Sequence, residues 1–294
     1  MGRDRIIAIA PGCFVVIWAT GFVTAREGVR YADPITLVTI RFAIACVLLT
    51  VLAAATGARR PTRSDALHSV VVGLLLQTTY ICGVFAAVDH GLAAGVTALV
   101  TSLQPLLSAC VVGPLLKERV LPLQWIGVAI GLGGVALVVE RKVHFDTATT
   151  TGLALAIAAL VGITAGTIYQ RRFCTRIDLR TGSACQYATG ALASLVIAAS
   201  FEPMHVDWTW QLAASLAWMS VVLSTGSILG FLWLIRRMEV ARVASLFYLV
   251  PPLTALMAWP WFGETVSWAM AGGMALAGVG VALVQKGARG QRAR

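Results

Sequence analysis

Long apolar stretches alternate with short polar segments along the whole chain. Each stretch holds about the 20 residues that an α-helix needs to cross a bilayer. The ten stretches are 6–25, 34–55, 67–88, 92–113, 122–139, 151–170, 181–200, 212–235, 240–260 and 265–284. They lack the strict alternation of barrel strands, and lipid offers no partner for free backbone groups, so we expect helices. The pattern predicts an all-α integral membrane protein with ten transmembrane helices.

Composition agrees with a chain that lies mostly inside a membrane. Hydrophobic residues make up 58% of it and charged residues only 12%, with a mean hydropathy of +0.82. Soluble domains carry about 25% charged residues. The first stretch follows Arg3 and Arg5, as a secretory signal would, but it is long, contains Pro11 and precedes further spans. We therefore interpret it as a retained helix.

The positively charged residues are distributed unequally between the two sides of the membrane. The net charge is +10, which in a soluble protein would suggest a nucleic-acid partner. If the N-terminus is cytoplasmic, 18 of the 23 Lys and Arg residues fall in cytoplasmic segments, including a basic tail at 285–294. Outer loops hold four, and Arg41 lies within a span. This follows the positive-inside rule. It predicts cytoplasmic N- and C-termini and leaves no basic patch for nucleic acid.

The chain repeats itself at its midpoint. The sequence "GVALV" occurs at 134–138 and again at 280–284. The same shift of 146 residues, without a gap, aligns the pairs Pro105 and Pro251, Glu118 and Glu264, and Gly127 and Gly273. The chain is thus read as two units, 6–139 and 151–284, with five spans each. Because five is odd, the second unit should enter the membrane inverted relative to the first.

These segments resemble the EamA-type members of the drug/metabolite transporter (DMT) superfamily. The resemblance rests on "IWATGFVTAREG" from Ile17, "DPITLVTIRFAIA" from Asp33, "SLQPLL" to "GVALV" in the first unit, and "YLVPPL" to "GVALV" in the second. It implies ten helices in two inverted five-helix repeats, and a secondary transporter in the cytoplasmic (inner) membrane. Export is the commoner direction that it implies. It does not identify the substrate, because the superfamily moves amino acids, other metabolites, drugs and sugar derivatives.

Interrupted helices and buried polar groups mark the candidate substrate site. In inverted-repeat transporters this site lies near the midplane between the repeats. Pro105 and the pair Pro251 and Pro252 are equivalent mid-span positions, predicted as helix breaks or hinges or, alternatively, as simple packing bends. Polar side chains within spans either line the cavity or join helices by hydrogen bonds. These candidates are Trp18, Thr20, Gln77, Tyr80, Ser102, Gln104, Tyr169, Gln186, Tyr187, Ser224, Thr225, Ser227 and Tyr248.

Arg41 is the only cation well inside a predicted span. An intramembrane charge is a functional hypothesis by default, and a guanidinium binds a carboxylate in a bidentate pair. Alternatively the side chain reaches the outer surface or caps backbone carbonyls, since it lies roughly 10 Å from the outer end of its span at 1.5 Å per residue. The resemblance also implies an Arg here whatever the substrate, which favours a structural role.

Carboxylates are absent from the span interiors. All 13 Asp and Glu residues lie in loops or at span margins, which disfavours exchange of cationic drugs or simple carboxylate coupling to protons. Glu118 and Glu264 are read as helix-start residues. Small residues at helical spacing predict close helix contacts, either within the chain or in a homodimer. They are Gly127, Gly131, Gly134, Gly273, Ala277 and Gly280.

The sequence offers little chemistry for catalysis. Its four His residues lie at edges or in loops, its six Cys residues show no metal or redox spacing, and it has no Gly-rich phosphate loop. We expect no catalytic residue, metal or cofactor. The hypothesis is a secondary transporter that exports an amino acid or a related amphiphilic metabolite, with the solute and the lipid bilayer as its partners. Alternatives are an exporter of drugs or sugar derivatives, and a non-transporting scaffold or sensor.

Overall fold

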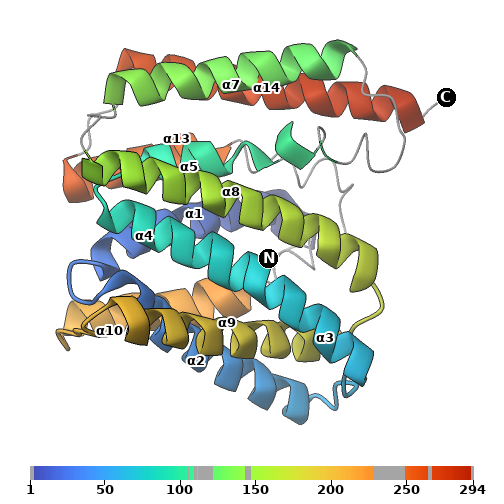
Figure 1. Ribbon diagram of the computed structural model, residues 1–294. Helices are drawn as coiled ribbons and strands as arrows, with labels where there is room; N and C mark the ends of the chain where they lie inside the picture. Colours follow the sequence, from blue (N-terminus) through green and yellow to red (C-terminus); the bar gives the residue numbers. More distant parts are fainter. Residues whose placement is uncertain are drawn as a thin grey trace.

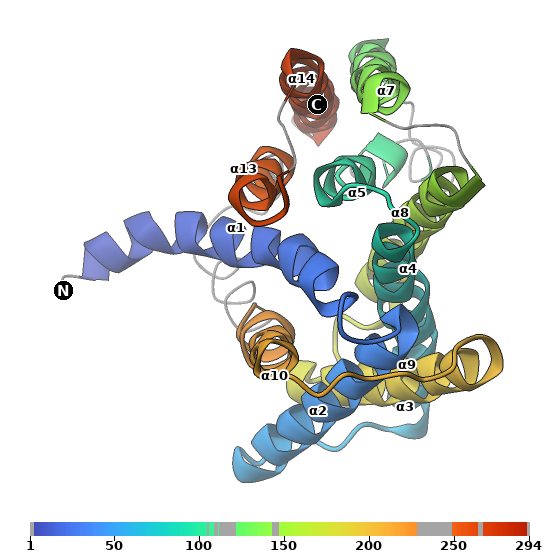
Figure 2. The same cartoon turned by 90° about the vertical axis from the view of Figure 1, so that its left-hand side faces the viewer.

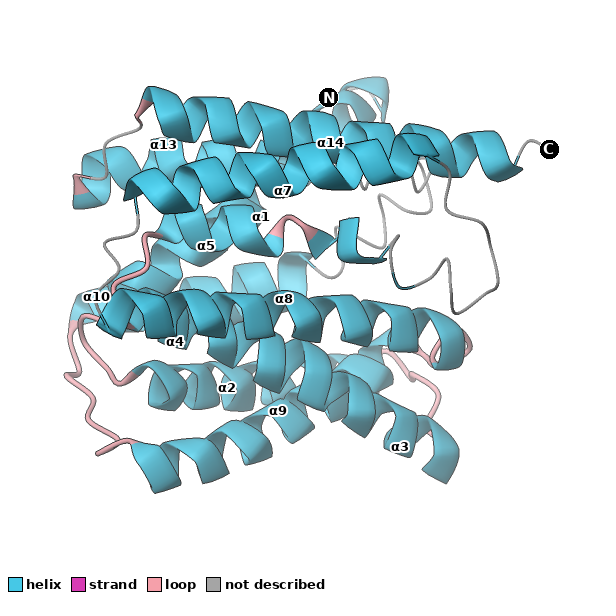
Figure 3. Cartoon of the chain, turned by 45° about the horizontal axis from the view of Figure 1, so that its top comes forward, coloured by secondary structure: helices cyan, strands magenta, loops and turns pink. Residues whose placement is uncertain are grey.

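The computed structural model describes residues 3–104, 106–108, 111, 122–142, 147–227, 249–263 and 267–292. Within these ranges every predicted span contains helix, and no strand is formed beyond an isolated bridge between Ala32 and Val206. Figure 3 shows the helices running roughly side by side, with loops at their ends. The prediction of an all-helical protein is confirmed.

The helices follow one another with short connections. They are α1 (Arg3–Gly28), α2 (Pro34–Ala55), α3 (Arg63–Val72), η1 (Gly73–Cys82), α4 (Gly83–Asp89), α5 (Ala94–Thr101), α7 (Pro122–Lys142), α8 (Thr147–Phe173), α9 (Leu179–Phe201), α10 (Trp210–Ala217), η2 (Trp218–Gly226), α13 (Val250–Phe262) and α14 (Trp268–Arg292). By length and hydropathy, four of the described segments are able to span a membrane: α2, the continuous α3–η1–α4 rod, α8 and α9. The full count of ten spans stays a prediction.

Local sequence signals set several helix ends. Pro34 opens α2, where a missing N–H costs nothing because that group has no partner within the helix. Thr62 and Asp65 form a capping box at the start of α3: each side chain accepts a hydrogen bond from the backbone N–H of the other residue. Gly263 ends α13 in the left-handed conformation, at φ 65°. These boundaries follow from residues visible in the sequence.

Helices from the two halves of the chain pack against each other in pairs. Figures 1 and 2 show α7 beside α14, and α2 also packs on α9 and α5 on α13. A Cβ atom on Gly134 would lie 2.5 Å from the carbonyl oxygen of Gly273, and one on Gly280 would overlap the carbonyl of Gly127. Thus α7 and α14 run antiparallel with their backbones in contact. The small residues that were predicted to allow close helix contact lie at this contact between two helices of the same chain.

Two rods contain π-helix at equivalent places. A shift of 146 residues places residues 73–80 of η1 on residues 219–226 of η2. Side chains in both segments bond the carbonyl five residues earlier: Thr79 Oγ1 donates to the oxygen of Leu74 at 3.0 Å, and Thr225 Oγ1 to that of Ser220 at 3.1 Å. Long π segments are rare and frequently occur at functional sites. Both halves therefore depart from α geometry at the same place.

The predicted proline breaks lie partly outside the described residues. Helix α5 ends at Thr101, and a turn follows at Ser102 and Leu103, whose N–H donates to the carbonyl of Val100 at 3.2 Å. Pro105 itself is not among the described residues. Pro251 and Pro252 lie in the first turn of α13, and the chain just before Leu249 is likewise not described. Their role as hinges stays a prediction.

One end of the α2–α9 pair is closed by a set of contacts that we call the clasp: Asp33, Ile35 and Thr36 with Glu202 and His205. The Glu202 carboxylate accepts hydrogen bonds from the backbone N–H groups of Ile35 and Thr36, both at 2.8 Å, and from the Thr36 hydroxyl at 2.8 Å. Asp33 accepts a bond from the His205 N–H at 2.7 Å. The carboxylate of the residue just after α9 thus caps the N-terminus of α2.

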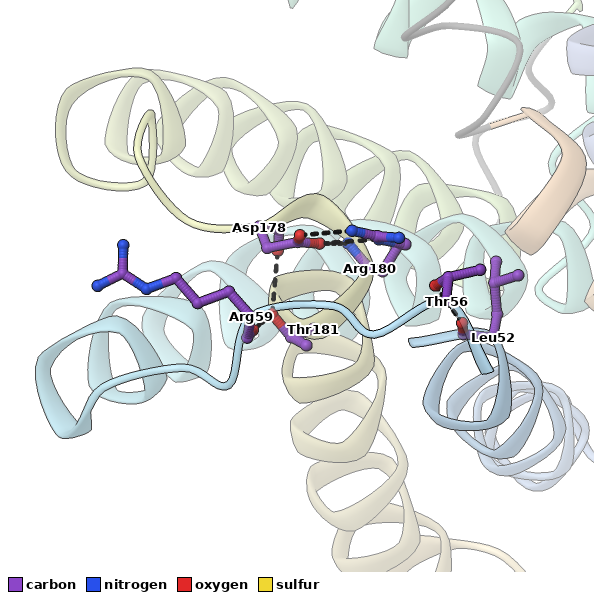
Figure 4. A network of polar contacts seen from close by, with 6 residues as sticks. All are labelled: Leu52, Thr56, Arg59, Asp178, Arg180 and Thr181. Carbon is purple, nitrogen blue, oxygen red and sulfur yellow. Dashed lines mark hydrogen bonds and ion pairs between the residues drawn. The ribbon is translucent and has the colours of Figure 1, made fainter. Parts of the chain in front are cut away.

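The opposite end of this pair, which we call the arginine-rich end, is shown in Figure 4. Thr181 Oγ1 in α9 donates to the backbone carbonyl of Arg59, just after α2, at 3.1 Å. Asp178 binds the Arg180 guanidinium through both of its oxygens, at 3.1 and 2.8 Å. These hydrogen bonds from Arg180 hold the pKa of the Asp178 carboxyl below its usual value. Helices α2 and α9 are therefore tied at both ends.

Candidate substrate site

A buried polar cluster surrounds Arg41, and we call its members Arg41, Tyr80, Phe85, Tyr187 and Ser224 the Arg41 cluster. The Arg41 side chain is only 7% exposed, so it lies inside the bundle and does not reach the surface. Its Nε donates to Ser224 Oγ at 3.2 Å. Its guanidinium carbon lies 5.9 Å from the centre of the Phe85 ring, within the range of a cation–π contact. Tyr80 and Tyr187 are buried in its neighbourhood.

The cluster draws on both halves of the chain. Arg41 comes from α2, Tyr80 and Phe85 from η1 and α4, Tyr187 from α9 and Ser224 from η2. Each π-helix therefore delivers one polar member. The wider turn of a π-helix changes which side chains face a neighbour, and here it turns a tyrosine and a serine towards the same arginine.

No carboxylate among the described residues balances the charge of Arg41. Among the residues that the structure describes, Arg41 makes no ion pair, and its terminal nitrogens donate no hydrogen bond to the protein. The Glu202 carboxylate is bound to the start of α2. A buried charge without a partner is costly. The guanidinium and the buried rings beside it make the cluster a candidate site for an anionic group.

Gln77 and Gln186 lie beside this cluster. Gln77 is buried, and its Cβ lies 2.6 Å from the position that a Cβ on Gly190 would take, next to Phe42. Phe42 meets Tyr187 edge-on, with ring centres 5.6 Å apart. Gln186, buried in α9, lines a small cavity on the side of the arginine-rich end. Glycine at position 190 is what allows η1 to approach α9 this closely.

The remaining polar candidates are engaged elsewhere. Thr20 Oγ1 accepts a hydrogen bond from Trp218 Nε1 at 2.9 Å, and Gln104 Nε2 donates to Thr167 Oγ1 at 3.1 Å. Backbone carbonyls, or neighbouring rings and side chains, engage Trp18, Ser102, Tyr169, Thr225 and Ser227. Tyr248 and Pro105 lie outside the described residues. Most of these contacts are the helix-to-helix or local bonds that were the alternative reading.

Three participants carried little signal in the sequence. Phe85 is one apolar residue among many in its span, and no pattern sets it apart. Ser220 Oγ bonds the backbone carbonyl of Arg41 at 3.5 Å. Glu202 reads as a loop carboxylate, yet it caps a helix that begins 168 residues earlier, at Pro34. Only the arrangement of the π-helices and loops in space brings these residues to Arg41 or to its helix.

A larger, apolar hollow lies between α13 and α14. Its volume is about 430 Å³, and its lining includes Pro252, Leu256, Met274, Ala275 and Gly278. None of its lining residues is charged, so it offers no group that would orient a polar solute. The Arg41 cluster is the better candidate for solute recognition.

Comparison with known proteins agrees with this arrangement. The sequence model of the EamA-like transporter family matches residues 7–140 and, a second time, residues 150–285. The chain belongs to the EamA-like transporter family. The resemblance seen in the sequence is thereby confirmed, and this EamA-like protein is a multi-pass membrane transporter.

Named relatives of this EamA-like transporter span nearly the same length. It is 25% identical over 254 residues to the uncharacterized inner membrane transporter YedA of Escherichia coli, covering 86% of this chain and 81% of that protein. It is 26% identical over 283 residues to a probable terminal-alkyne amino-acid exporter of Streptantibioticus cattleyicolor, covering 95% and 93%. A probable amino-acid metabolite efflux pump of Salmonella typhimurium is 26% identical over 290 residues, covering 94% and 91%.

A solved structure shares the fold. It is titled "Crystal structure of protein", and it matches with a TM-score of 0.68 at 21% sequence identity, over 98% of this chain and 99% of that one. At this identity the likeness concerns the fold alone. It shows that the helix arrangement described here also occurs in a crystal.

Proposed function

We propose that this EamA-like transporter exports an amino acid or a related carboxylate-bearing amphiphile by alternating access, with Arg41 as the carboxylate site. The observation that carries the proposal is the buried guanidinium, which has no counter-ion among the residues that the structure describes. A carboxylate would meet the free fork in bidentate geometry, and the rings of Tyr80, Phe85 and Tyr187 would meet the apolar part of the solute. Two relatives whose names mention amino acids support this class.

Alternating access is proposed on the basis of the internal symmetry. The chain would form ten spans in two inverted repeats, 6–139 and 151–284. The double family match, the equivalent π-helices and the packing of α2 on α9, α5 on α13 and α7 on α14 all support this arrangement. Rocking of one repeat against the other would expose the Arg41 cluster to each side in turn.

The orientation is also a proposal, supported by the two ends of the bundle. The segment that holds Arg59, Arg60 and Arg63 meets the start of α9, which follows Arg171, Arg172 and Arg176. The clasp, at the other end of α2 and α9, holds Asp33, Glu202 and Asp207 nearby. Under the positive-inside rule the arginine-rich end is cytoplasmic, and so are both termini.

Counterflow in proteoliposomes tests the proposal. Purified protein is assayed with amino acids, the matching amines without a carboxylate, sugars and organic cations. We expect counterflow of the carboxylate-bearing class, reduced by at least about tenfold in Arg41→Gln, since roughly 1.4 kcal/mol of lost binding is a factor of ten. Arg41→Lys should be intermediate, because it keeps the charge and loses the fork.

Arg30→Gln is the matched control, because Arg30 lies in an exposed pair with Glu27. It should transport like the unchanged protein. Equal counterflow of the amine and the amino acid, or full activity in a folded Arg41→Gln protein, would remove Arg41 from the site. Counterflow of only drugs or sugar derivatives would favour that alternative, and none of any class would favour a scaffold or sensor.

A further inference from the structure

The small cavity that Gln186 lines lies between α3, α8 and α9, on the side of the arginine-rich end. Its volume is about 20 Å³, and its lining includes Ser69, Cys174, Asp178, Gly182, Ser183 and Gln186. This lining is far more polar than that of the hollow between α13 and α14. Residues from both halves of the chain meet here, since Ser69 belongs to α3 and the others to the second half.

Ser69 contributes a hydroxyl that has no partner in the part of the chain that the structure describes. Its side chain is fully buried, and Oγ makes no hydrogen bond. Oγ lies 3.8 Å from the position that a Cβ on Gly182 would take, so the absent side chain leaves room in front of it. Buried polar groups in proteins are nearly always hydrogen-bonded, to the protein or to ordered water. We therefore expect the Ser69 hydroxyl to form a hydrogen bond with a molecule in this cavity.

We propose that the cavity binds a single water molecule that bridges Ser69 of α3 to the polar side chains of α9. A cavity needs about 10–15 Å³ of accessible volume to hold one water, and this one provides about 20 Å³. A buried water also needs two to four polar partners. Ser69 provides one, and Ser183 and Gln186, both buried, provide the others. The inference rests on the packing of the bundle and not on the proposed substrate.

The surroundings favour a neutral ligand over a cation. Asp178 is the only carboxylate in the lining, and both of its oxygens already bind Arg180. The neighbouring segments 59–63 and 171–180 are rich in arginine. A metal cation of similar size would meet this positive field without a free carboxylate to offset it. Water, which both donates and accepts hydrogen bonds, satisfies hydroxyl and amide groups alike.

A pair of variants tests the proposal through the midpoint temperature of thermal unfolding. Thr78 provides the matched control: its Oγ1 is also buried and unpartnered, but it lines neither cavity. Ser69→Ala should lower the midpoint by about 2–4 °C, because it removes a partner of the water. Thr78→Val should leave the midpoint unchanged or raise it, because it removes a hydroxyl without a bond.

Two outcomes would overturn the proposal. A midpoint that rises in Ser69→Ala as in Thr78→Val would mean that the cavity is dry. Unfolding repeated in sodium, potassium and choline chloride separates water from a cation: stabilisation by sodium alone, lost in Ser69→Ala, would assign the cavity to a metal ion. With water, the midpoint should not depend on which of these salts is present.

Discussion

Arg41 is placed in the interior by contacts that orient it without neutralising it. Ser224 accepts a hydrogen bond from Nε, and Phe85 faces the guanidinium. Both contacts leave the two terminal nitrogens, the pair that would bind a carboxylate, without a protein partner among the described residues. An arginine that served only to join helices would use this fork on backbone carbonyls. These contacts agree with the proposed role of Arg41 as a binding group.

Ser224→Ala tests this positioning. Loss of the hydrogen bond to Nε should leave the charge in place but release its orientation, because a bond to a charged group contributes about 1.5–3 kcal/mol. We expect KM for the carboxylate-bearing solute to rise about tenfold, with a smaller change in the maximal rate. The measurement is concentration-dependent counterflow. Ser200→Ala is the control, since that exposed hydroxyl bonds only its own helix; equal KM values in the two variants would contradict the role.

At the residue scale, sequence reasoning selected Arg41, Tyr80, Tyr187 and Ser224 as candidates because charged and polar residues stand out in apolar spans. It could not separate them from Thr20, Gln104 or Tyr169, whose partners lie on other helices. The two groups of residues differ in the direction in which their side chains point, and this direction depends on the rotation of each helix about its axis. A π segment changes that rotation by an amount that hydrophobic periodicity does not show.

At the scale of elements, the contact between α7 and α14 depends on glycine. Adding Cβ to Gly134 brings it within 2.5 Å of the Gly273 carbonyl, whereas Cβ on the adjacent Gly133 meets nothing within 4 Å. The two positions lie on one helix and carry the same residue. They therefore separate the effect of close packing from that of helix propensity.

Gly134→Ala should destabilise the protein, and Gly133→Ala should leave it unchanged or slightly more stable. The expected difference is about 1–3 kcal/mol, the usual cost of forcing extra atoms into a packed contact. Unfolding of the purified protein in detergent measures it. If both variants unfold at the same midpoint, the two helices are not in the close contact described here.

Some element boundaries carry local signals, although the expected stretches at 67–88 and 151–170 begin four residues after the helices α3 and α8, which start at Arg63 and Thr147. Caps such as Thr62 with Asp65, Pro34 at a helix start and Gly263 at a helix end are local signals. The choice of partner for each helix is not local. The repeat showed that two equivalent units exist, but the antiparallel pairing of α2 with α9 appears only in the structure.

At the scale of the whole molecule, α2 and α9 form a two-helix unit that crosses between the halves. The clasp closes one end and the Thr181 to Arg59 bond the other. Between them, Phe42 packs against Tyr187. A unit tied at both ends should move as one body during transport, so the rearrangement must take place in the helices around it.

A disulfide across the clasp tests this idea. Ala32 and Val206 form an antiparallel bridge, flanked by the hydrogen bonds from Asp33 N–H to the His205 carbonyl and from Asp207 N–H to the Tyr31 carbonyl. Such non-hydrogen-bonded pairs have Cα atoms about 4.5 Å apart, within the range that a disulfide spans. Ala32→Cys with Val206→Cys should cross-link, and counterflow should stay within about twofold of the reduced protein. A block that dithiothreitol reverses would show that the clasp opens in the cycle.

The contact between α7 and α14 joins two helices that are synthesised at different times. Gly134 meets Gly273, which follows it by 139 residues in the chain. At about 5–20 residues per second, the ribosome needs roughly 7–28 s to supply that partner. For this interval α7 has no α14 to pack against. The contact between the two helices is thus completed only after α14 has been synthesised.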